Sequence, residues 1–509
     1  MKLLPSALAV LLLVLPAQAA SPGRSMRGAA QMHVESLAAA EPLRSGLVGV
    51  LAVTMSGDTL VSYNPSSRMV PASNMKLLTT GVALNVLGED FRFPTVLAYS
   101  GSVRDSTLFG DLYIVGGSDP TIGSRSDCAL AVHTLFARWK KILSEGGIRR
   151  IQGRIIGDSR SMLPEIPLSW TLEDVGSYYG AVPEALNFFE NAQNFSVTPG
   201  ATVGSEVKME PDYPQTPWMR YVSTCTTSPA RCGDEMVYLN TALAPVGQLS
   251  GHYSVDRRRK TLECSNRFGA YTCAYHFRKY LTESGMRVDG GWADISPEGL
   301  VRENLENPSG LDEAPEQGSL NELGKSLSPS LADIVFDTNH FSDNFFAETL
   351  LHAVGTALEG SPAYDSCYVA MKTAFRNLGL RSSGGCQLKD GSGLSRKNYV
   401  SPEFFVSFLK AMAGTPQWET YLNSLPVPAE RGTLEFRMKS SPESVRSRIH
   451  MKSGSMNGVR CFSGYILSAD ADPSRTIVFS LMTNNVTAGS WSVYPVLDDM
   501  IACLAAENN

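Results

Sequence analysis

A run of apolar residues at helical spacing extends from Leu77 to Leu87, and Gly88 follows it. Ser73 stands just before this run and Lys76 opens it. A serine in the first turn of a helix lies beside free backbone N–H groups. A residue three positions later shares its face, about 5–6 Å away between Cβ atoms. The pair therefore predicts a serine nucleophile with a lysine base within reach.

This serine–lysine spacing is not unique, because it occurs again at Ser205/Lys208 and Ser407/Lys410. A serine that only caps a helix is the ordinary meaning of such a pair. Two motifs much further along the chain favour Ser73 over the other two serines.

The first of these motifs is Ser342-Asp343-Asn344, which interrupts two apolar segments predicted to be helices. The second is Lys452-Ser453-Gly454, the one K-[ST]-G triplet of the chain, within a predicted strand. Serine and asparagine two residues apart are common, and the chain also has Ser62/Asn64, Ser319/Asn321 and Ser455/Asn457. The order and the structural context of the three motifs carry the argument.

The order S-x-x-K, S-D-N, K-S-G resembles the penicillin-binding protein and serine β-lactamase superfamily. More narrowly, the chain resembles the low-molecular-mass D-alanyl-D-alanine carboxypeptidase/endopeptidases, whose transpeptidase-like domain is split. The distance from Lys76 to Ser342 is 266 residues, far more than in compact relatives. Further stretches agree with this branch: Gly117–Thr121, Ile155–Asp158, Tyr179–Asn187, Asp390–Arg396 and Gly432–Leu434.

The resemblance implies an α/β fold, in which a split β-lactamase-like domain of antiparallel sheet plus helices carries inserted mainly-β domains. We expect a signal peptide at 1–20, the transpeptidase-like domain at 21–95 and 326–509, and inserted domains at 96–325. A loop-rich β module is expected at about 200–290. Strands are predicted at 46–55, 59–63, 448–454, 458–466 and 477–482, and helices at 129–145, 330–340, 345–358, 363–378 and 493–505.

The resemblance also implies roles for the motif residues. Ser73 would be the nucleophile and Lys76 its base, with Ser342 relaying a proton to the leaving amine and Asn344 holding the substrate amide. Lys76 can act only when neutral, and burial or a neighbouring cation such as Lys452 favours that form.

The strand that carries the K-S-G motif would bind the substrate's terminal carboxylate and the carbonyl oxygen of the bond that is cleaved. Lys452 and Ser453 would bind the terminal carboxylate, and Gly454 is included among the substrate-binding residues. Backbone N–H groups of Ser73 and Ser455 would form an oxyanion hole, each donor worth roughly 3–4 kcal/mol. Met456, on the same strand, is included among the substrate-binding residues.

In this family an acidic residue of the inserted domain and an arginine of the D-G-S-G-L-S-R loop reach the cleft near the substrate's peptide side chain. Asp158 and Arg396 stand at those positions, while Leu163 replaces an aromatic residue that is frequent there. The alternatives are an ordinary turn aspartate and a surface ion pair.

Composition excludes several other functions. The net charge is −6 and no long basic run occurs, so nucleic acid is not an expected partner. The seven histidines form no close pair that could hold a metal from one helix, and we expect no metal or other cofactor.

The N-terminus predicts export. Met1-Lys2, an apolar stretch to Pro16 and the ending Ala17-Gln18-Ala19 are typical of a secretory signal, although an uncleaved membrane anchor is the alternative. We therefore expect a periplasmic or otherwise exported protein with at most peripheral membrane association. An oxidising compartment favours disulfides among the nine cysteines, with Cys225–Cys232 and Cys264–Cys273 as the expected pairs.

The predicted function is a serine-type D-alanyl-D-alanine carboxypeptidase/endopeptidase. It would act on peptidoglycan stem peptides and cross-links and be inhibited covalently by β-lactams. One alternative is a serine β-lactamase, which needs a separate water-activating acid that the sequence does not reveal. The other is a non-catalytic penicillin-binding homologue, which the joint presence of Ser73, Lys76, Ser342 and Lys452 disfavours.

Overall fold

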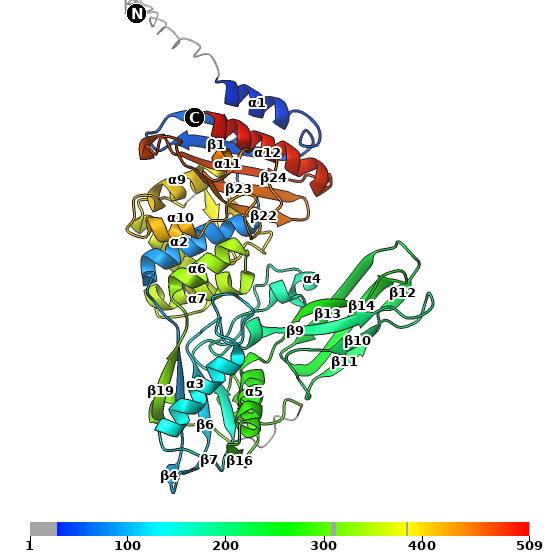
Figure 1. The fold of residues 1–509 in the computed structure, drawn as a ribbon, viewed down its shortest axis with the longest axis vertical. Helices are drawn as coiled ribbons and strands as arrows, with labels where there is room; N and C mark the ends of the chain where they lie inside the picture. Colours follow the sequence, from blue (N-terminus) through cyan, green and yellow to red (C-terminus); the bar gives the residue numbers. More distant parts are fainter. Residues whose placement is uncertain (1–27, 307–311, 383–384, 508–509) are drawn as a thin grey trace, which may run out of the picture.

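The computed structural model describes residues 28–306, 312–382 and 385–507. Figure 1 shows an elongated molecule with a layered sheet-and-helix region at one end and a second region of sheet and helices at the other. A long β arm projects sideways from the second region.

The layered region contains a five-stranded antiparallel sheet in the order β2-β1-β24-β23-β22. Strands from the two ends of the chain meet in it, since β1 pairs with β24 from Leu47 opposite Asn484 to Thr54 opposite Ile477. The α/β fold class and the five predicted strands are thereby confirmed. Their bounds are β1 Leu47–Thr54, β2 Thr59–Tyr63, β22 Ile449–Met456, β23 Val459–Ile466 and β24 Ile477–Asn484.

Both faces of this sheet are covered, which explains why every residue of β24 is buried. Phe479 and Leu481 point into a core shared with α1 (Ala29–Ala38) and α12 (Ser490–Ala506). Val478 and Met482 belong to the core of the helical layer on the opposite face. A strand between two helical layers needs apolar residues on both sides.

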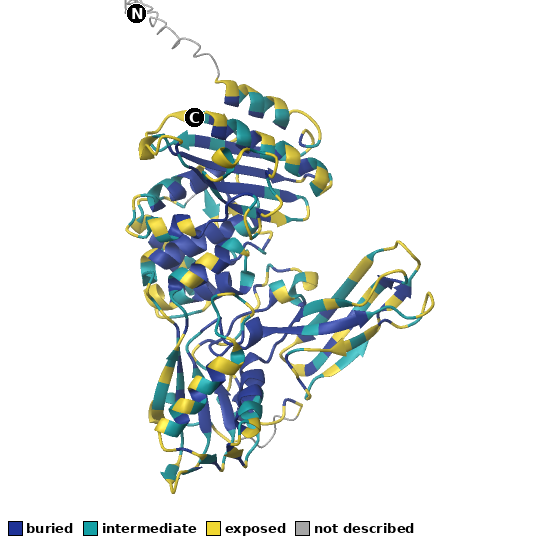
Figure 2. Ribbon diagram, in the orientation of Figure 1, coloured by how far each residue is buried: buried dark blue, intermediate teal, exposed yellow. Residues whose placement is uncertain are grey.

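The helical layer carries the first two motifs. The predicted helices are confirmed as α2 (Met75–Leu87), α6 (Leu331–His340), α7 (Asn344–Glu359) and α8 (Tyr364–Asn377), and Gly88 ends α2 with φ +84°. Helices α9 (Pro402–Met412) and α10 (Trp418–Asn423) complete the layer. A short helix, α11 (Glu443–Arg446), precedes β22. Figure 2 shows that buried residues dominate the sheet and this layer.

The second region is built on a six-stranded sheet, in the order β18-β17-β8-β6-β3-β19, and on two helices, α3 (Val132–Glu145) and α5 (Gly269–Glu283). Helix α5 lies where the sequence predicted only strands and loops. Its apolar residues Ala270, Ala274 and Phe277 recur at helical spacing and join the core of this region. The strands are β3 Pro94–Tyr99, β6 Leu112–Gly116, β8 Ile155–Asp158, β17 Trp292–Ile295, β18 Val301–Arg302 and β19 Asn321–Leu327.

The arm is formed by two small sheets, β10-β9-β15 and β11-β14-β12 with β13 beside β14. They share a core that includes Phe195, Tyr238 and Leu249. The bounds are β9 Ala192–Thr198, β10 Lys208–Pro211, β11 Arg220–Ser223, β12 Thr226–Ser228, β13 Asp234–Thr241, β14 Ala244–Ser254 and β15 Lys260–Ser265. Short strands β4 Ser102–Arg104, β5 Thr107–Phe109, β7 Arg150–Ile151 and β16 Arg287–Val288 form a further sheet at the far end.

The expected disulfides are wrong for this structure, in which all nine cysteines are free thiols. Cys225 is buried in the arm core, whereas Cys232 is exposed. Cys264 belongs to the arm core and Cys273 to the core beneath α5. The two cysteines of each expected pair are close in sequence, but the fold places them in different environments.

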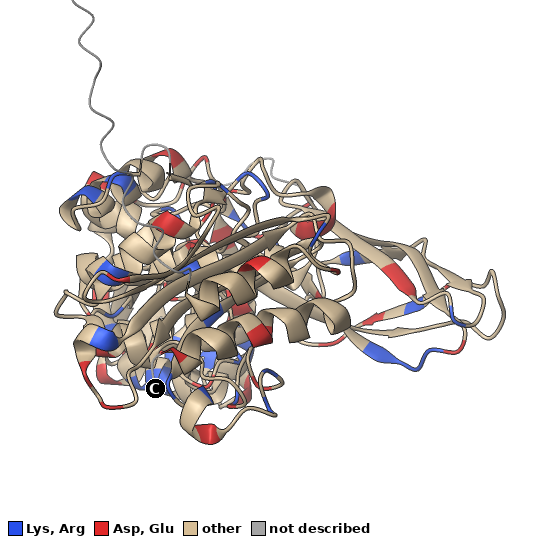
Figure 3. Cartoon of the chain, turned by 90° about the horizontal axis from the view of Figure 1, so that it is seen from above, with Lys and Arg blue, Asp and Glu red and all other residues tan. Residues whose placement is uncertain are grey.

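The remaining expectations concern export, membrane association and the distribution of charge. Across the described ranges, no helix has the length and apolarity that crossing a bilayer requires. The expected signal peptide at 1–20 lies outside the described residues. In Figure 3, basic and acidic residues are interspersed over the view rather than separated by sign.

Candidate active site

Ser73 lies in a short 3₁₀ turn, η1 (Ala72–Asn74), that leads directly into α2. The Lys76 ammonium Nζ donates a hydrogen bond to Ser73 Oγ at 3.1 Å, as the serine–lysine spacing predicts. Ala72 enters the turn with φ +46°, a conformation that costs an L-residue about 1–2 kcal/mol. Ser73 itself remains half-exposed above the buried Lys76.

Lys76 is surrounded by uncharged hydrogen-bond acceptors. Besides Ser73, its Nζ donates to Oδ1 of Asn344 at 2.6 Å and to the Ser392 carbonyl at 2.8 Å. Burial lowers the pKa of Lys76 to about 8, although nearby carboxylates, with Asp343 foremost, oppose this shift. A lysine with this pKa is partly neutral near neutral pH and can accept a proton.

Lys452, on β22, holds the second serine. Its Nζ donates to Ser342 Oγ and to the Ser453 carbonyl, both at 2.9 Å. Burial lowers the pKa of Lys452 well below its usual value, and the charge of Lys76 lowers it further. The sequence argument named burial and the neighbouring cation Lys452 as causes of a low pKa for Lys76, and burial is the leading cause for both lysines.

The third motif needs a glycine at position 454, because the backbone of the turn that carries Ser73 packs closely against this residue. β22 is an edge strand of the sheet and packs against η1. A Cβ on Gly454 would lie 2.5 Å from the Pro71 carbonyl oxygen and 3.0 Å from the Asn74 amide nitrogen. Ser455 and Met456 follow on the same edge, with Ser455 exposed and Met456 half-buried.

The second motif forms the break between α6 and α7. Ser342 has φ +61°, and the Asp343 carboxylate caps α7 by accepting a hydrogen bond from the Phe346 amide at 2.8 Å. Asn344 begins α7, and its Nδ2 donates to the Tyr179 carbonyl at 2.9 Å. Capping by Asp343 thus presents Ser342 and Asn344 to the two lysines.

One buried carboxylate that the sequence did not single out supports the site. Glu348, one turn after Asn344 on α7, accepts hydrogen bonds from the backbone amides of Gly391 and Ser392, the latter at 2.7 Å. The same peptide segment supplies the carbonyl that binds Lys76. The spacing of Asn344 and Glu348, four residues apart in a predicted helix, was the signal that could have indicated this.

The inserted region also reaches the loop at 390–396. Trp170 Nε1 donates to the Asp390 carboxylate at 2.9 Å, and Ser395 Oγ donates to Ser169 Oγ at 2.7 Å. The exposed Arg396 contacts the Asn457 carbonyl, at 3.3 Å from each terminal nitrogen of the guanidinium.

Among the residues that the structure describes, Asp158 makes no hydrogen bond to Arg396 or to the three motifs. It is fully buried at the end of β8, where its Oδ2 accepts from Arg160 at 2.8 Å and from Gln317 at 3.0 Å. The arginine two residues later neutralises the carboxylate. Within the described chain, no group of three or more His, Cys, Asp or Glu residues is arranged to hold a metal ion.

Comparison with known proteins gives consistent matches. The D-Ala-D-Ala carboxypeptidase 3 (S13) family model matches residues 30–493. A D-alanyl-D-alanine carboxypeptidase of Actinomadura sp. (strain R39) is 28% identical over 461 residues, which cover 87% of this chain and 79% of that protein. The D-alanyl-D-alanine carboxypeptidase DacB of Haemophilus influenzae is 25% identical, with 85% of each chain covered.

Among solved structures, penicillin binding protein 4 (dacB) from Haemophilus influenzae superposes with a TM-score of 0.76 at 22% identity. The match covers 93% of this chain and 98% of that one. It therefore shares the fold along nearly the whole described chain.

Proposed function

This chain belongs to the D-Ala-D-Ala carboxypeptidase 3 (S13) family of hydrolases, and we propose that Ser73 is the nucleophile of its peptidase reaction. The observation that carries the proposal is the double contact of Lys76 Nζ, with Ser73 Oγ at 3.1 Å and with Asn344 Oδ1 at 2.6 Å. This contact joins the first two motifs in one hydrogen-bonded unit around a buried lysine.

Acylation begins when neutral Lys76 accepts the proton of the Ser73 hydroxyl. Ser73 Oγ then bonds to the carbonyl carbon of the penultimate D-alanine. Positioned proton transfer of this kind contributes roughly 10²–10⁴ in rate. The backbone N–H groups of Ser73 and of Ser455, which lies on the edge strand β22, would stabilise the developing oxyanion.

Collapse of the intermediate breaks the C–N bond to the terminal D-alanine. The proton from Lys76 reaches the leaving amine through the Ser342 hydroxyl, which Lys452 holds at 2.9 Å. Lys452 and Ser453 bind the terminal carboxylate, and Asn344 and Met456 contact the substrate backbone. Water then cleaves the Ser73 ester and returns the proton to the serine.

A β-lactam follows the same first step, but its ring nitrogen stays attached to the acyl group, so the leaving group cannot diffuse away. The proposed partners are thus peptidoglycan stem peptides, their cross-links and β-lactam antibiotics. The proposal includes export after removal of residues 1–20 and the division into a split domain (21–95 and 326–509) with insertions at 96–325. The contacts of Trp170 and Ser169 with the loop at 390–396 support a role for the inserted region beside the cleft.

The roles of Asp158 and Arg396 are proposed in a narrower form. Arg396 is exposed beside Asn457 and can contact a substrate. Asp158 is engaged by Arg160 and acts on the cleft only through the wall that this ion pair supports.

Release of D-alanine from a D-alanyl-D-alanine peptide tests the proposal. Wild-type protein should release the terminal residue, and Ser73→Ala should not, while Ser407→Ala serves as a matched control from another serine–lysine pair. Equal activity of Ser73→Ala and wild type would exclude Ser73 as the nucleophile.

A further inference from the structure

One stretch of the inserted region crosses to the loop at 390–396 and contacts it twice. Trp170 Nε1 donates a hydrogen bond to the Asp390 carboxylate at 2.9 Å. Ser395 Oγ donates to Ser169 Oγ at 2.7 Å. Trp170 is buried, with 7% of the residue exposed, so its ring is largely shielded from a substrate in the cleft. The tryptophan therefore acts on the loop.

Asp390 is the centre of the hydrogen bonding in this loop. Its fully buried carboxylate accepts hydrogen bonds from the Gly393 amide at 2.9 Å, from Asn398 Nδ2 at 2.7 Å and from the Ser395 amide. Among the described residues, the Trp170 indole is the one donor that reaches Asp390 from the inserted region. A buried carboxylate that loses a donor is costly, because water cannot easily replace it. Loss of the indole N–H is thus expected to let the loop shift.

The loop packs directly against the reacting groups. The Ser392 carbonyl accepts the hydrogen bond from Lys76 Nζ at 2.8 Å. Gly393 has φ +88°, and a Cβ on it would lie 1.9 Å from the carbonyl oxygen of Ala72, the residue before Ser73 in the 3₁₀ turn. A shift of this loop would therefore displace one of the acceptors that hold Lys76, together with a backbone contact of the turn that carries Ser73.

Two other tryptophans of the inserted region show that burial of an indole does not by itself supply such a contact. The N–H groups of Trp139 and Trp218 are buried and have no hydrogen-bond partner within the described chain. Trp170 instead directs its N–H at a charged oxygen, the kind of acceptor that gives the stronger hydrogen bonds. The contact with Asp390 is thus specific to this position.

We propose that Trp170 is a positioning residue for the reaction, which holds the Ser392 carbonyl on Lys76 by way of Asp390. The inference rests on the proposed function, because Lys76 is the base only if Ser73 is the nucleophile. The inserted region then contributes to the proton transfer itself, beyond any part it has in binding the substrate. Small displacements around a reacting group are costly, so the effect is expected in the chemical step.

Steady-state release of D-alanine from a D-alanyl-D-alanine peptide tests the proposal. Trp170→Phe keeps an aromatic ring and removes the N–H. Its kcat should fall by about five- to ten-fold while KM stays at the wild-type value, because an interaction that acts on the base affects the transition state alone. Trp218→Phe, the matched control, removes an indole N–H that has no acceptor within the described residues and should change neither constant.

A second variant keeps the test decisive if Trp170→Phe folds poorly. Ser169→Ala loosens the same crossing at Ser395 and leaves the tryptophan in place. Its kcat should fall by about two- to three-fold, again at an unchanged KM. Near-UV circular dichroism establishes that each variant compared is folded.

An unchanged kcat in folded Trp170→Phe would overturn the assignment. A loss of kcat/KM that comes from a higher KM would overturn it too, since Trp170 would then act on substrate binding. If Trp170→Phe does not fold, an unchanged kcat in Ser169→Ala overturns it. In each case, release of D-alanine by wild type and its absence in Ser73→Ala would still support the proposed function. A wild type that releases no D-alanine would overturn the proposed function and the assignment together.

Discussion

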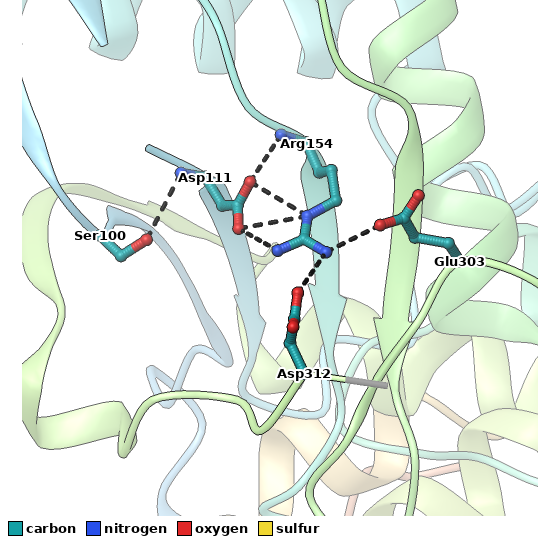
Figure 4. A network of polar contacts seen from close by, with 5 residues as sticks. All are labelled: Ser100, Asp111, Arg154, Glu303 and Asp312. Atoms are coloured by element: carbon teal, nitrogen blue, oxygen red, sulfur yellow. Dashed lines mark hydrogen bonds and ion pairs between the residues drawn. The ribbon is translucent and has the colours of Figure 1, made fainter. Parts of the chain in front are cut away.

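The two buried lysines of the active site and Arg154, a part-buried cation of the inserted region, have opposite surroundings. Lys76 and Lys452 donate to hydroxyl, amide and carbonyl oxygens. Arg154, in the inserted region, bonds directly to carboxylates: its side chain binds Asp111 at 2.7 Å and Glu303 at 2.8 Å, and Asp312 completes the network (Figure 4).

The difference separates a chemical role from a structural one. The hydrogen bonds to Asp111 raise the pKa of Arg154, which keeps its charge at every accessible pH. Burial among uncharged oxygens lowers the pKa of Lys76 to about 8. A direct carboxylate partner would hold Lys76 protonated and unable to act as a base.

The largest expected effect comes from removing the base. Lys76→Met should lower the rate of acylation by a β-lactam by about 10²–10⁴. Lys410→Met is the matched control, because Lys410 also follows a serine by three residues, and its one hydrogen bond within the described residues goes to the Thr54 carbonyl at 3.3 Å. Stopped-flow acylation of both variants measures the effect, and equal losses in the two would contradict the assigned role.

The second effect is a dependence on pH. Burial lowers the pKa of Lys76 from the usual lysine value of 10.5 to about 8, so the neutral base becomes available as the pH rises toward about 8. Acylation should therefore increase by roughly ten-fold per pH unit below about pH 7 and level off above the pKa. A rate that is flat or falls between pH 6 and 8 would place the base elsewhere.

A smaller effect is expected for Glu348, which orients the Ser392 carbonyl without contacting Lys76 Nζ. Glu348→Gln should lower acylation by about ten-fold, since small displacements around a reacting group are costly. The negative charge of Glu348 raises the pKa of Lys76. Removing that charge in Glu348→Gln should lower the pKa of Lys76, so the acid limb of the pH profile of the variant should move to lower pH. Glu359→Gln, at the exposed end of the same helix, is the control. An unchanged rate and profile for Glu348→Gln would mean that the loop at 391–392 is held by other contacts.

The smallest effect on activity is expected in the inserted region. Arg154→Met should reduce the free energy of unfolding by about 1–3 kcal/mol, because it leaves a half-buried carboxylate at Asp111 unpaired. Acylation per folded molecule should not change. Urea unfolding of Arg154→Met measures this loss. Arg44→Met, which removes the exposed ion pair with Glu41, is the control for a general effect of losing a positive charge. A loss of acylation in Arg154→Met would show that the network also shapes the cleft.

The sequence predicted the three motifs because their signals are local, whereas the split sheet was implied by the family resemblance. Helical spacing placed Lys76 beside Ser73, and a capped break between helices presents Ser342 and Asn344. The single K-S-G triplet lies on a strand whose apolar pattern is clear. Each of these signals depends on a few consecutive residues.

Other features could not be read from short segments. The role of Asp158 depends on Arg160, whose guanidinium turns back onto it. The contact of Trp170 with Asp390 joins segments 220 residues apart, and left-handed φ values at 189–191 leave no clear trace in the sequence. Spacing alone also suggested cysteine pairs that the fold separates.

The intact mass of the protein after incubation with benzylpenicillin, followed by peptide mapping, tests the central claim most directly. We predict one adduct on the wild-type protein, located on Ser73, absent from Ser73→Ala and retained in Ser407→Ala. A long-lived adduct supports the carboxypeptidase reaction, whereas rapid turnover would indicate a β-lactamase. An adduct that persists in folded Ser73→Ala, or maps to another serine, would contradict the claim.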